Sequence, residues 1–390
     1  MRSTDFTAAA PGQLVPTIAH QLAFVPDALP PQIDLNDIAI SLGNAMQAIG
    51  ELKGACRRLS NPYILISPLQ RREALTSSAM EGTFTTADDL ALAEVGIERD
   101  HDDSTREVRN YLRALNESLR MLDDLPICHR VITTDHEILL SGLSRSRGAQ
   151  KRPGEYKVDQ NWIGGRLIEN ARFVPPPPVE TRACMDAVEV YINREGVDFP
   201  TPLMDLALVH YQLETIHPFA DGNGRVGRML ISIMAVKSGL LDLPVLYVSP
   251  ALEHDKDEYI DLLFNVSARG EWVAWLNFFF NKIVAACQDT VSTIDRLIDL
   301  QDNYRKLAGA AVRSANAISL VDSLFERPAV TVTAAAEKLS VTYAAAKKTI
   351  DKLEELGILT EVPGIYPKTF IATGVMNAAR HDIQETTVAA

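Results

Sequence analysis

The sequence contains few cysteines, no long apolar run and less positive than negative charge. Its four cysteines, Cys56, Cys128, Cys184 and Cys287, stand far apart, without a C-x-x-C pair or a Cys/His spacing suited to zinc, which indicates reduced structural thiols. No segment reaches the roughly 18 consecutive apolar residues of a membrane helix. The N-terminus shows no apolar core of the kind that marks a secretory signal. We therefore expect a protein that does not cross a membrane and works in the cytoplasm.

The chain carries 38 lysines and arginines against 51 aspartates and glutamates, which gives a net charge of −13. Such a surface repels nucleic acid and anionic lipid, which argues against a general nucleic-acid coat or a peripheral membrane protein. A small local cluster of positive charge is compatible with this total. The 46% hydrophobic and 23% charged residues are typical of a globular protein, and a length of 390 residues indicates two or three domains.

Helical periodicity dominates most of the chain, because apolar residues recur three or four positions apart. The first 36 residues differ, since their five prolines favour an extended arm over a helix. The consecutive charges of residues 98–103 indicate a solvated loop. The expected helices cover residues 38–59, 69–80 (ending at Gly82), 104–123, 131–142, 180–194, 202–216 and 225–238, with further core helices within 257–297.

Two regions depart from this pattern. Residues 154–165 combine β-favouring side chains with glycines at both ends, which predicts a short hairpin that projects from the helical body. The C-terminal part predicts three short helices, at 317–326, 331–339 and 342–356, and then a hairpin between residues 358 and 371. Three helices followed by a β wing are the plan of a winged helix-turn-helix.

The segment from His217 to Arg228 contains the residues that can carry chemistry. Within it, Gly222 to Gly227 fits the G-x-G-x-x-G pattern of dinucleotide-binding proteins. That pattern has meaning only directly after a strand, whereas a long apolar helix is expected here. A Walker A loop is absent from the sequence. The segment therefore needs another interpretation.

Its glycines and arginines suit a phosphate site. Gly222 and Gly224 let the backbone approach a ligand closely, and the helix expected from Arg225 offers unpaired N–H groups and the positive end of its dipole to an anion. Arg225 and Arg228 lie three residues apart, so they share one face of that helix and can reach a multiply charged tail. An arginine pair on a helix is by itself more often a solvated face.

Asp221 and His217 stand just before these residues. One carboxylate can hold a Mg²⁺ that phosphates already bridge, and a histidine can accept a proton near neutral pH. A single histidine is more often a capping or core residue. The combination of all these residues in one segment favours a nucleotide site with a general base at its edge.

Residues 217–228 match every specified position of H-x-F-x-[DE]-G-N-G-R-x-x-R, and by this match the chain resembles the Fic proteins. Members of that family typically transfer AMP from ATP to a hydroxyl side chain of a target protein. The resemblance implies that His217 deprotonates the target hydroxyl, which attacks the α-phosphate in line, and that Asp221 holds Mg²⁺. The other specified residues would bind phosphates, the first three at the α- and β-phosphates and the last two at the β/γ end: Gly222, Asn223, Gly224, Arg225 and Arg228.

The hairpin expected at 154–165 lies where the family keeps its flap, an exposed strand edge that pairs with the target peptide. Lysine at position 157 departs from the arginine common in that flap, which leaves the target preference open. Tyr259 falls where the family forms its adenine pocket, although a buried structural tyrosine is an equal alternative. The residues to which the resemblance gives a target-binding role are Tyr156, Lys157, Val158, Trp162 and Ile163, of which Tyr156 and Trp162 could equally anchor the hairpin.

Ser77 to Gly82 matches [ST]-x-x-x-E-[GN], the inhibitory motif that many Fic proteins carry on a helix next to the nucleotide site. Glu81 would lie in the last turn of its helix, where the dipole disfavours an anion by roughly 0.3–1 kcal/mol unless a cation compensates. The resemblance names Arg228 as that cation. We hypothesise that Glu81 pairs with Arg228, occupies the γ-phosphate position and keeps basal activity low, with Ser77 in support one turn earlier. A solvated glutamate by a helix end is the alternative.

The sequence thus predicts a mainly α fold. It comprises an extended arm (1–36), an N-terminal helical region with the inhibitory helix (37–110), a helical Fic catalytic core with its hairpin flap (111–300), and a winged helix-turn-helix domain with a tail (301–390). The expected activity is that of a protein adenylyltransferase that uses ATP and Mg²⁺ on an unidentified target protein. Self-modification and a homodimer are left open.

Two other functions are consistent with the sequence. A transcription regulator would sense a nucleotide with the Fic part and bind DNA with the winged helix, as Lys347, Lys348 and Lys352 favour. Against this, residues 317–378 hold six basic and seven acidic side chains, whereas a DNA reader is usually basic. A protein-contact or dimerisation role for this unit is therefore favoured. The second alternative is an enzyme that removes AMP from its targets, with Glu81 positioning a water.

Overall fold

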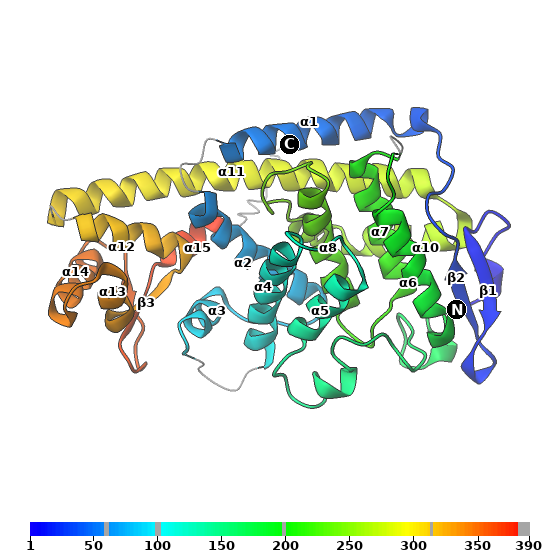
Figure 1. The fold of residues 1–390 in the computed structure, drawn as a ribbon, viewed down its shortest axis with the longest axis horizontal. Helices are drawn as coiled ribbons and strands as arrows, with labels where there is room; N and C mark the ends of the chain where they lie inside the picture. Colours follow the sequence, from blue (N-terminus) through cyan, green and yellow to red (C-terminus); the bar gives the residue numbers. More distant parts are fainter. Residues whose placement is uncertain (58–61, 98–102, 197–199, 313–314, 381–390) are drawn as a thin grey trace, which may run out of the picture.

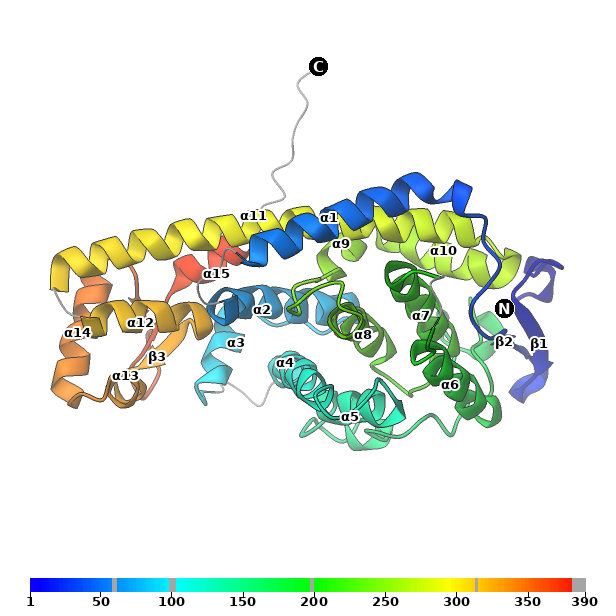
Figure 2. The same ribbon diagram turned by 45° about the horizontal axis from the view of Figure 1, so that its top comes forward.

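A computed structural model describes residues 1–57, 62–97, 103–196, 200–312 and 315–380. Helices dominate these residues, as expected. The helix α11 (Trp272–Val312) runs along most of the long axis of the molecule (Figure 1). Helix α1 (Ala39–Arg57) packs along it, and Figure 2 shows the two side by side with the other helices beneath them. No helix among the described residues is long and apolar enough to cross a membrane.

The N-terminal segment forms a β-hairpin rather than a plain extended arm. Strand β1 (Gly12–Pro16) pairs antiparallel with β2 (Leu22–Pro26) at the end of the molecule opposite the C-terminal helices (Figure 1). The prolines prevent an α-helix, as predicted, but Pro16 and Pro26 stand at strand ends, where a missing N–H is tolerated. Three short 3-10 turns complete the segment: η1 (Ser3–Asp5), η2 (Ile18–His20) and η3 (Leu35–Asp37).

Helix α2 (Pro62–Met80) begins seven residues before the predicted start, because it continues through Pro68. A proline removes one backbone hydrogen bond and usually ends a helix, so the sequence favoured a start after it. Gly82 follows with φ +79°, the left-handed conformation expected at this helix end. The next helix, α3 (Ala87–Glu94), was not predicted; its N-terminus is capped by the side chain of Thr86.

The buried helix predicted over residues 202–216 is confirmed with those bounds as α7 (Pro202–Ile216). The side chain of Thr201 caps its first turn, and nearly all of its side chains are buried, which explains the apolar sequence without a polar face. The other helices of the body begin within two residues of a predicted bound, except α9 (Ser249–His254), which lies before the predicted range 257–297 and was not predicted. They are α4 (Asp103–Met121), α5 (His129–Leu139), α6 (Pro178–Ile192), α8 (Asn223–Lys237), α9 and α10 (Lys256–Arg269).

The hairpin predicted over 154–165 is displaced along the chain. Residues 154–162 form no strand, and an isolated antiparallel bridge joins Ile163 to Phe173. The chain reverses just after this bridge residue, at Gly164 and Gly165, which have φ of +72° and +81°. The two glycines therefore form the turn rather than the end of the hairpin. The first half of the segment is held by side chains instead, as described below.

The C-terminal end of α11 packs into the C-terminal unit, while the rest of this helix packs into the main body. The main core of the body includes Ile294, whereas Leu297 belongs to the core of the C-terminal unit, so the expected boundary at residue 300 falls within one continuous helix. The expected boundary at residue 110 similarly falls within α4. Helix α12 (Ala315–Glu326) packs against α2, which places the C-terminal unit next to the helix that precedes Glu81.

This unit contains the three predicted helices and a three-stranded antiparallel sheet of order β3-β5-β4. Strand β3 and the last helix were not predicted. Whether the unit acts as a winged helix stays a prediction. Its elements are α12 (Ala315–Glu326), β3 (Ala329–Thr331), α13 (Val332–Leu339), α14 (Tyr343–Glu355), β4 (Thr360–Glu361), β5 (Thr369–Ile371) and α15 (Thr373–Ala379). Of the charged loop expected at 98–103, residues 98–102 lie outside the described part of the chain.

Candidate active site

A short loop, residues 217–222, joins α7 to α8 and is called the catalytic loop below. His217 opens it at the end of α7 with φ +48° and ψ +60°. Asn223 closes it: its Oδ1 accepts a hydrogen bond from the N–H of Phe219 (2.7 Å), and its Nδ2 donates to the carbonyl of Phe219 (2.9 Å). The Asn223 side chain thus stabilises the loop, whereas the resemblance implies that it binds phosphates.

The ring of His217 is oriented by the helix that precedes it. Nδ1 lies 3.3 Å from the carbonyl oxygen of Glu214, which can only accept, so Nδ1 carries the proton and Nε2 keeps its lone pair. Burial and the nearby charge of Lys157 lower the pKa of His217 to about 4, against the opposing effect of Glu81. The imidazole is therefore neutral at pH 7, which is the form that a general base requires.

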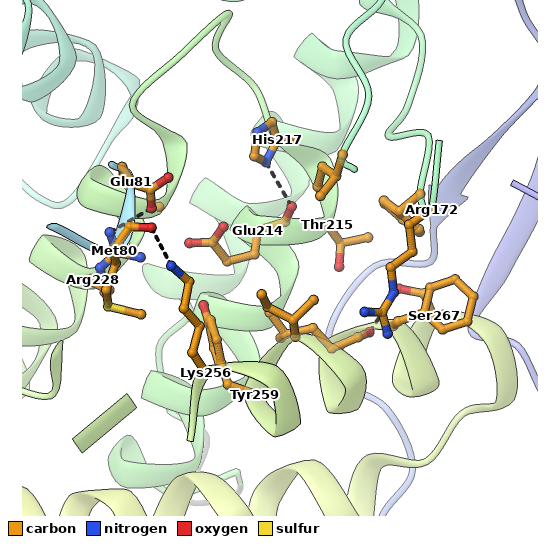
Figure 3. A pocket seen from close by; sticks show the side chains of 16 residues that line it. Met80, Glu81, Arg172, Glu214, Thr215, His217, Arg228, Lys256, Tyr259 and Ser267 are labelled. Atoms are coloured by element: carbon orange, nitrogen blue, oxygen red, sulfur yellow. Dashed lines mark hydrogen bonds and ion pairs between the residues drawn. The ribbon is translucent and has the colours of Figure 1, made fainter. Parts of the chain in front are cut away.

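His217 lines a cavity of about 240 Å³ that lies between α7, α8, α10, the end of α2 and the 163–173 segment. Figure 3 shows Glu81 and Arg228 at one end, Glu214 and His217 above, and Tyr259 rising from α10. The Tyr259 hydroxyl lies 2.9 Å from Nε2 of His210 and is buried, so this residue both lines the cavity and is fixed in the core. The apolar lining comes mainly from Met80, Ile163, Phe173, Ile260, Leu263 and Phe264.

Arg228 and the end of α2 are joined by three hydrogen bonds. The guanidinium donates from Nη2 to Oε1 of Glu81 (2.7 Å) and to the carbonyl of Ser77 (2.8 Å), and from Nε to the Ser77 hydroxyl (2.9 Å). Arg228 is 2% exposed, while 35% of the Glu81 side chain is exposed. The structure thus brings together the three residues that the inhibitory motif and the signature named.

The Glu81 carboxylate lies against the first turn of α8. A Cβ on Gly224 would come within 2.1 Å of Oε1 of Glu81, so only glycine leaves room for the carboxylate there. Burial acts to raise the pKa of Glu81, but the charges of Arg228 and Arg225 together hold it below the usual range. Lys256 donates to the carbonyl of Met80 (2.7 Å) and so supplies a second cation at this helix end (Figure 3).

Arg225 points to a different set of partners. It forms ion pairs with Glu107 of α4 and with Asp221, whose Oδ1 lies 3.3 Å from Nη2. Arg225 is only 2% exposed, and burial lowers its pKa to about 10. Glu107 also binds Arg147 over 2.6 Å. Arg225 therefore connects the catalytic loop to α4. To bind phosphates as predicted, its guanidinium would have to contact them in addition to Glu107 and Asp221.

Asp221 offers a single carboxylate. Its Oδ1 accepts from the N–H of Gly222 (2.7 Å), whereas its Oδ2 lies 3.9 Å from Nζ of Lys151. The side chain is 43% exposed. No group of three or more candidate metal ligands exists among the described residues. These donors do not form a protein cage for a metal, but they fit Mg²⁺, which typically binds one or two carboxylates and completes its shell with phosphate oxygens and water.

Comparison with known proteins agrees with this geometry. Residues 126–235 match the model of the Fic/DOC family, and residues 40–120 match the model of the Fic/DOC family N-terminal region. The chain contains a Fic domain. Its fold is similar to a Fic family protein from Desulfovibrio desulfuricans G20, with a TM-score of 0.57 and 19% identity over 89% of this chain and 98% of that chain. A Fic domain containing signaling protein from Bacteroides thetaiotaomicron VPI-5482 covers 64% of this chain, with a TM-score of 0.50 and 19% identity.

Among curated proteins, protein adenylyltransferase Fic of Drosophila melanogaster is 28% identical over 202 residues, which span 50% of this chain and 37% of the relative. The protein of the same name from Drosophila erecta is 35% identical over 86 residues, or 22% of this chain and 16% of the relative. The matched part thus spans less than half the length of these curated relatives.

The residues predicted to form the target-binding flap do not share one environment. Val158 and Trp162 are 50% and 36% exposed, so they are available to a target. Ile163 lines the 240 Å³ cavity. Tyr156 bonds through its hydroxyl to Nδ1 of His129 (2.5 Å), and Lys157 is only 4% exposed. The ammonium of Lys157 is turned inward, where Nζ donates to the carbonyl of Ile216 (3.0 Å) and to Oδ1 of Asn161 (2.8 Å). A target-binding role stays a prediction for Lys157, Val158 and Trp162.

Sequence reasoning missed three residues that organise the Fic domain. His136 of α5 lies with Nε2 3.0 Å from the carbonyl of Asp221 and accepts from the N–H of Gly154 at Nδ1 (3.0 Å). Glu107 binds Arg225, as described above. Glu214 lines the cavity with its Oε1 buried and without a hydrogen-bond partner in the described part of the chain, and burial raises its pKa to about 7. None of the three lies in a sequence motif. His136 and Glu107 act through contacts with residues distant in sequence, and Glu214 lies within the apolar helix α7.

Proposed function

We propose that this protein transfers AMP from ATP to a hydroxyl side chain of a target protein. The observation that carries the proposal is a neutral His217, with Nε2 unprotonated, at a cavity that Arg228 and the first turn of α8 also line. A helix N-terminus and a buried arginine attract phosphate groups. The likeness to protein adenylyltransferases named Fic supports the same reaction, over half of this chain.

In the proposed reaction, Nε2 of His217 accepts the proton of the target hydroxyl as the oxygen forms a bond to the α-phosphorus of ATP. The bond from that phosphorus to the oxygen bridging the α- and β-phosphates breaks, and pyrophosphate leaves. Asp221 would hold Mg²⁺, which supplies charge neutralisation at the phosphates. The N–H groups that begin α8 and the guanidinium of Arg228 stabilise the remaining negative charge.

We further propose that Glu81 inhibits this reaction in the resting protein. Its carboxylate lies against Gly224 and accepts a hydrogen bond from Arg228, the two groups that a terminal phosphate would contact. ATP must therefore compete with Glu81 for Arg228 or bind in a non-productive pose. Removal of AMP from a target, a homodimer and DNA binding stay predictions, since no contact of the described residues favours them over AMP transfer.

The position of the radiolabel in ATP tests the reaction class. Incubation of the Glu81→Gly variant with Mg²⁺ and α-³²P-ATP should label protein, while γ-³²P-ATP should not, because pyrophosphate leaves with the γ-phosphate. His217→Ala in the same background should abolish labelling. Label from γ-³²P-ATP would indicate phosphoryl transfer instead, and no label from either nucleotide would contradict the proposal.

A further inference from the structure

Lys157 and Asn161 bind the backbone at the end of α7 and in the catalytic loop through hydrogen bonds. The backbone N–H of Lys157 donates to the carbonyl of Pro218 (2.8 Å), and its Nζ donates to the carbonyl of Ile216 (3.0 Å). Nδ2 of Asn161 donates to the carbonyls of His217 (2.9 Å) and Phe219 (3.0 Å). Each of the four successive carbonyls from Ile216 to Phe219 thus accepts a hydrogen bond from these two residues.

These four carbonyls surround a strained residue. His217 is a non-glycine residue in the left-handed region, a strained conformation that persists only where the surroundings fix it. The carbonyl of Ile216 is also one of the last of α7, where helix carbonyls lack partners within the helix. Hydrogen bonds to the carbonyls on both sides of His217 fix the backbone, and the backbone fixes where the imidazole points.

The two side chains also fix each other. Nζ of Lys157 donates to Oδ1 of Asn161 over 2.8 Å, so the amide oxygen of Asn161 faces the ammonium and its NH₂ faces the two carbonyls. No other orientation of the amide satisfies all three partners, because carbonyls only accept and an ammonium only donates. Lys157 is 4% exposed, so this arrangement is shielded from water.

We propose that Lys157 and Asn161 are positioning residues that hold the His217 imidazole in the geometry required for proton transfer. The proposal rests on the proposed AMP transfer, since it concerns the base of that reaction. Neither side chain lines the 240 Å³ cavity. Their loss should therefore slow the chemical step and leave ATP binding unchanged.

The test compares two equal exchanges in the Glu81→Gly background. Asn161→Asp keeps the size and the contact to Lys157 but places an acceptor against the carbonyls of His217 and Phe219. Asn170→Asp makes the same change at an exposed residue of the 163–173 segment. We expect kcat for AMP incorporation to fall by about 10- to 100-fold in Asn161→Asp alone, with the ATP Kd from calorimetry and the melting temperature unchanged in both. Equal kcat in the two variants, or a loss of kcat matched by a loss of ATP affinity, would overturn the proposal.

A second readout does not depend on activity. In protein labelled with ¹³C at histidine Cε1, the ring signal of His217 is identified by its absence from His217→Ala. Asn161→Leu, which changes no charge, should change the chemical shift of this signal. The signals of His20 and His254, which lie far from Asn161 in the sequence, should stay unchanged. An unchanged His217 signal would overturn the proposal. If Glu81→Gly itself incorporates no AMP while the ring signal moves as expected, the proposed reaction fails and the positioning of His217 stands.

Discussion

Arg228 of α8 donates hydrogen bonds to both the Glu81 carboxylate and the Ser77 backbone and hydroxyl, over 2.7 to 2.9 Å. One buried guanidinium thus connects the signature of the Fic domain to a motif 147 residues earlier in the chain. The same guanidinium is the group expected to bind the terminal phosphates. Under the proposed inhibition, whatever displaces Glu81 from Arg228 would control whether the site binds ATP productively.

Removing the charge of Glu81 should activate the protein. Glu81→Gln weakens the bond to Arg228, and a hydrogen bond between charged groups contributes about 1.5–3 kcal/mol, where 1.4 kcal/mol corresponds to tenfold. Because about a third of the Glu81 side chain is exposed, we expect the low end, about a tenfold rise in the rate of AMP incorporation. The matched control is Glu258→Gln, at an exposed position on α10. Equal rates in the two variants would show that Glu81 does not restrain the reaction.

The reaction rate should depend little on pH between 5.5 and 7.5. The folded-state pKa of His217 is depressed to about 4, so the base is neutral throughout this range and becomes protonated only as the pH falls toward 4. A histidine with an ordinary pKa of about 6.5 would be only about one-tenth neutral at pH 5.5, which would lower the rate about tenfold. The measurement is kcat of the Glu81→Gln variant at saturating Mg-ATP. Burial raises the pKa of Glu214 in the same cavity to about 7, so the measurement is repeated with Glu214→Gln added. A midpoint near 6.5 that remains in this double variant would show that His217 is neither buried nor the base in the way described.

Loss of Glu107 should destabilise the fold. Glu107 is 2% exposed and binds both Arg225 and Arg147, so Glu107→Ala leaves the buried Arg225 with the partly exposed Asp221 as its remaining carboxylate. Breaking a buried ion pair from one side costs about 3–5 kcal/mol. Urea unfolding should show this loss for Glu107→Ala and little change for Glu117→Ala, a partly exposed glutamate on the same helix. Equal stability of the two variants would mean that Arg225 finds another partner.

The C-terminal unit should not bind double-stranded DNA. Two of the three lysines expected to favour DNA are neutralised within α14 itself, where Lys347 pairs with Asp351 and Lys352 pairs with Glu355. Mobility-shift experiments with genomic fragments at low salt should show no complex. A salt-sensitive complex that Lys348→Glu removes would contradict this expectation and favour the regulator alternative.

The residues of the site could be predicted where their chemistry is local. His217, Asp221 and the glycines lie within one short segment, and a turn followed by a helix suffices to place them together. The pairing of Glu81 with Arg228 was available only through the resemblance, since nothing in the spacing of 147 residues predicts a contact. Glu107, His136 and Asn161 gave no signal, because their partners are backbone or side-chain groups brought close by the packing of α4, α5 and the 157–161 segment.

The fold shows the same division. The helices α7 and α8 have strong local signals, a threonine cap and a glycine-rich start, and their bounds agree closely with the prediction. The N-terminal hairpin was missed, because its pairing depends on contacts such as that of Phe24 with Val174 rather than on its own alternation. Lys157 was assigned to the target-binding flap through the resemblance, and nothing in the local sequence indicates its burial. Its buried ammonium is satisfied by the carbonyl of Ile216 at the end of α7 and by Oδ1 of Asn161.

Intact mass spectrometry tests the central claim most directly. The Glu81→Gly variant is incubated with Mg-ATP and with no other protein, so that it is its own target, and should gain the mass of one AMP group. The variant that combines Glu81→Gly with His217→Ala should gain none. The wild-type protein should gain less than Glu81→Gly in the same time. An adduct that persists in the His217→Ala combination would show that His217 is not the base, and the absence of any adduct on Glu81→Gly, both on the protein itself and on proteins of a lysate, would contradict the account.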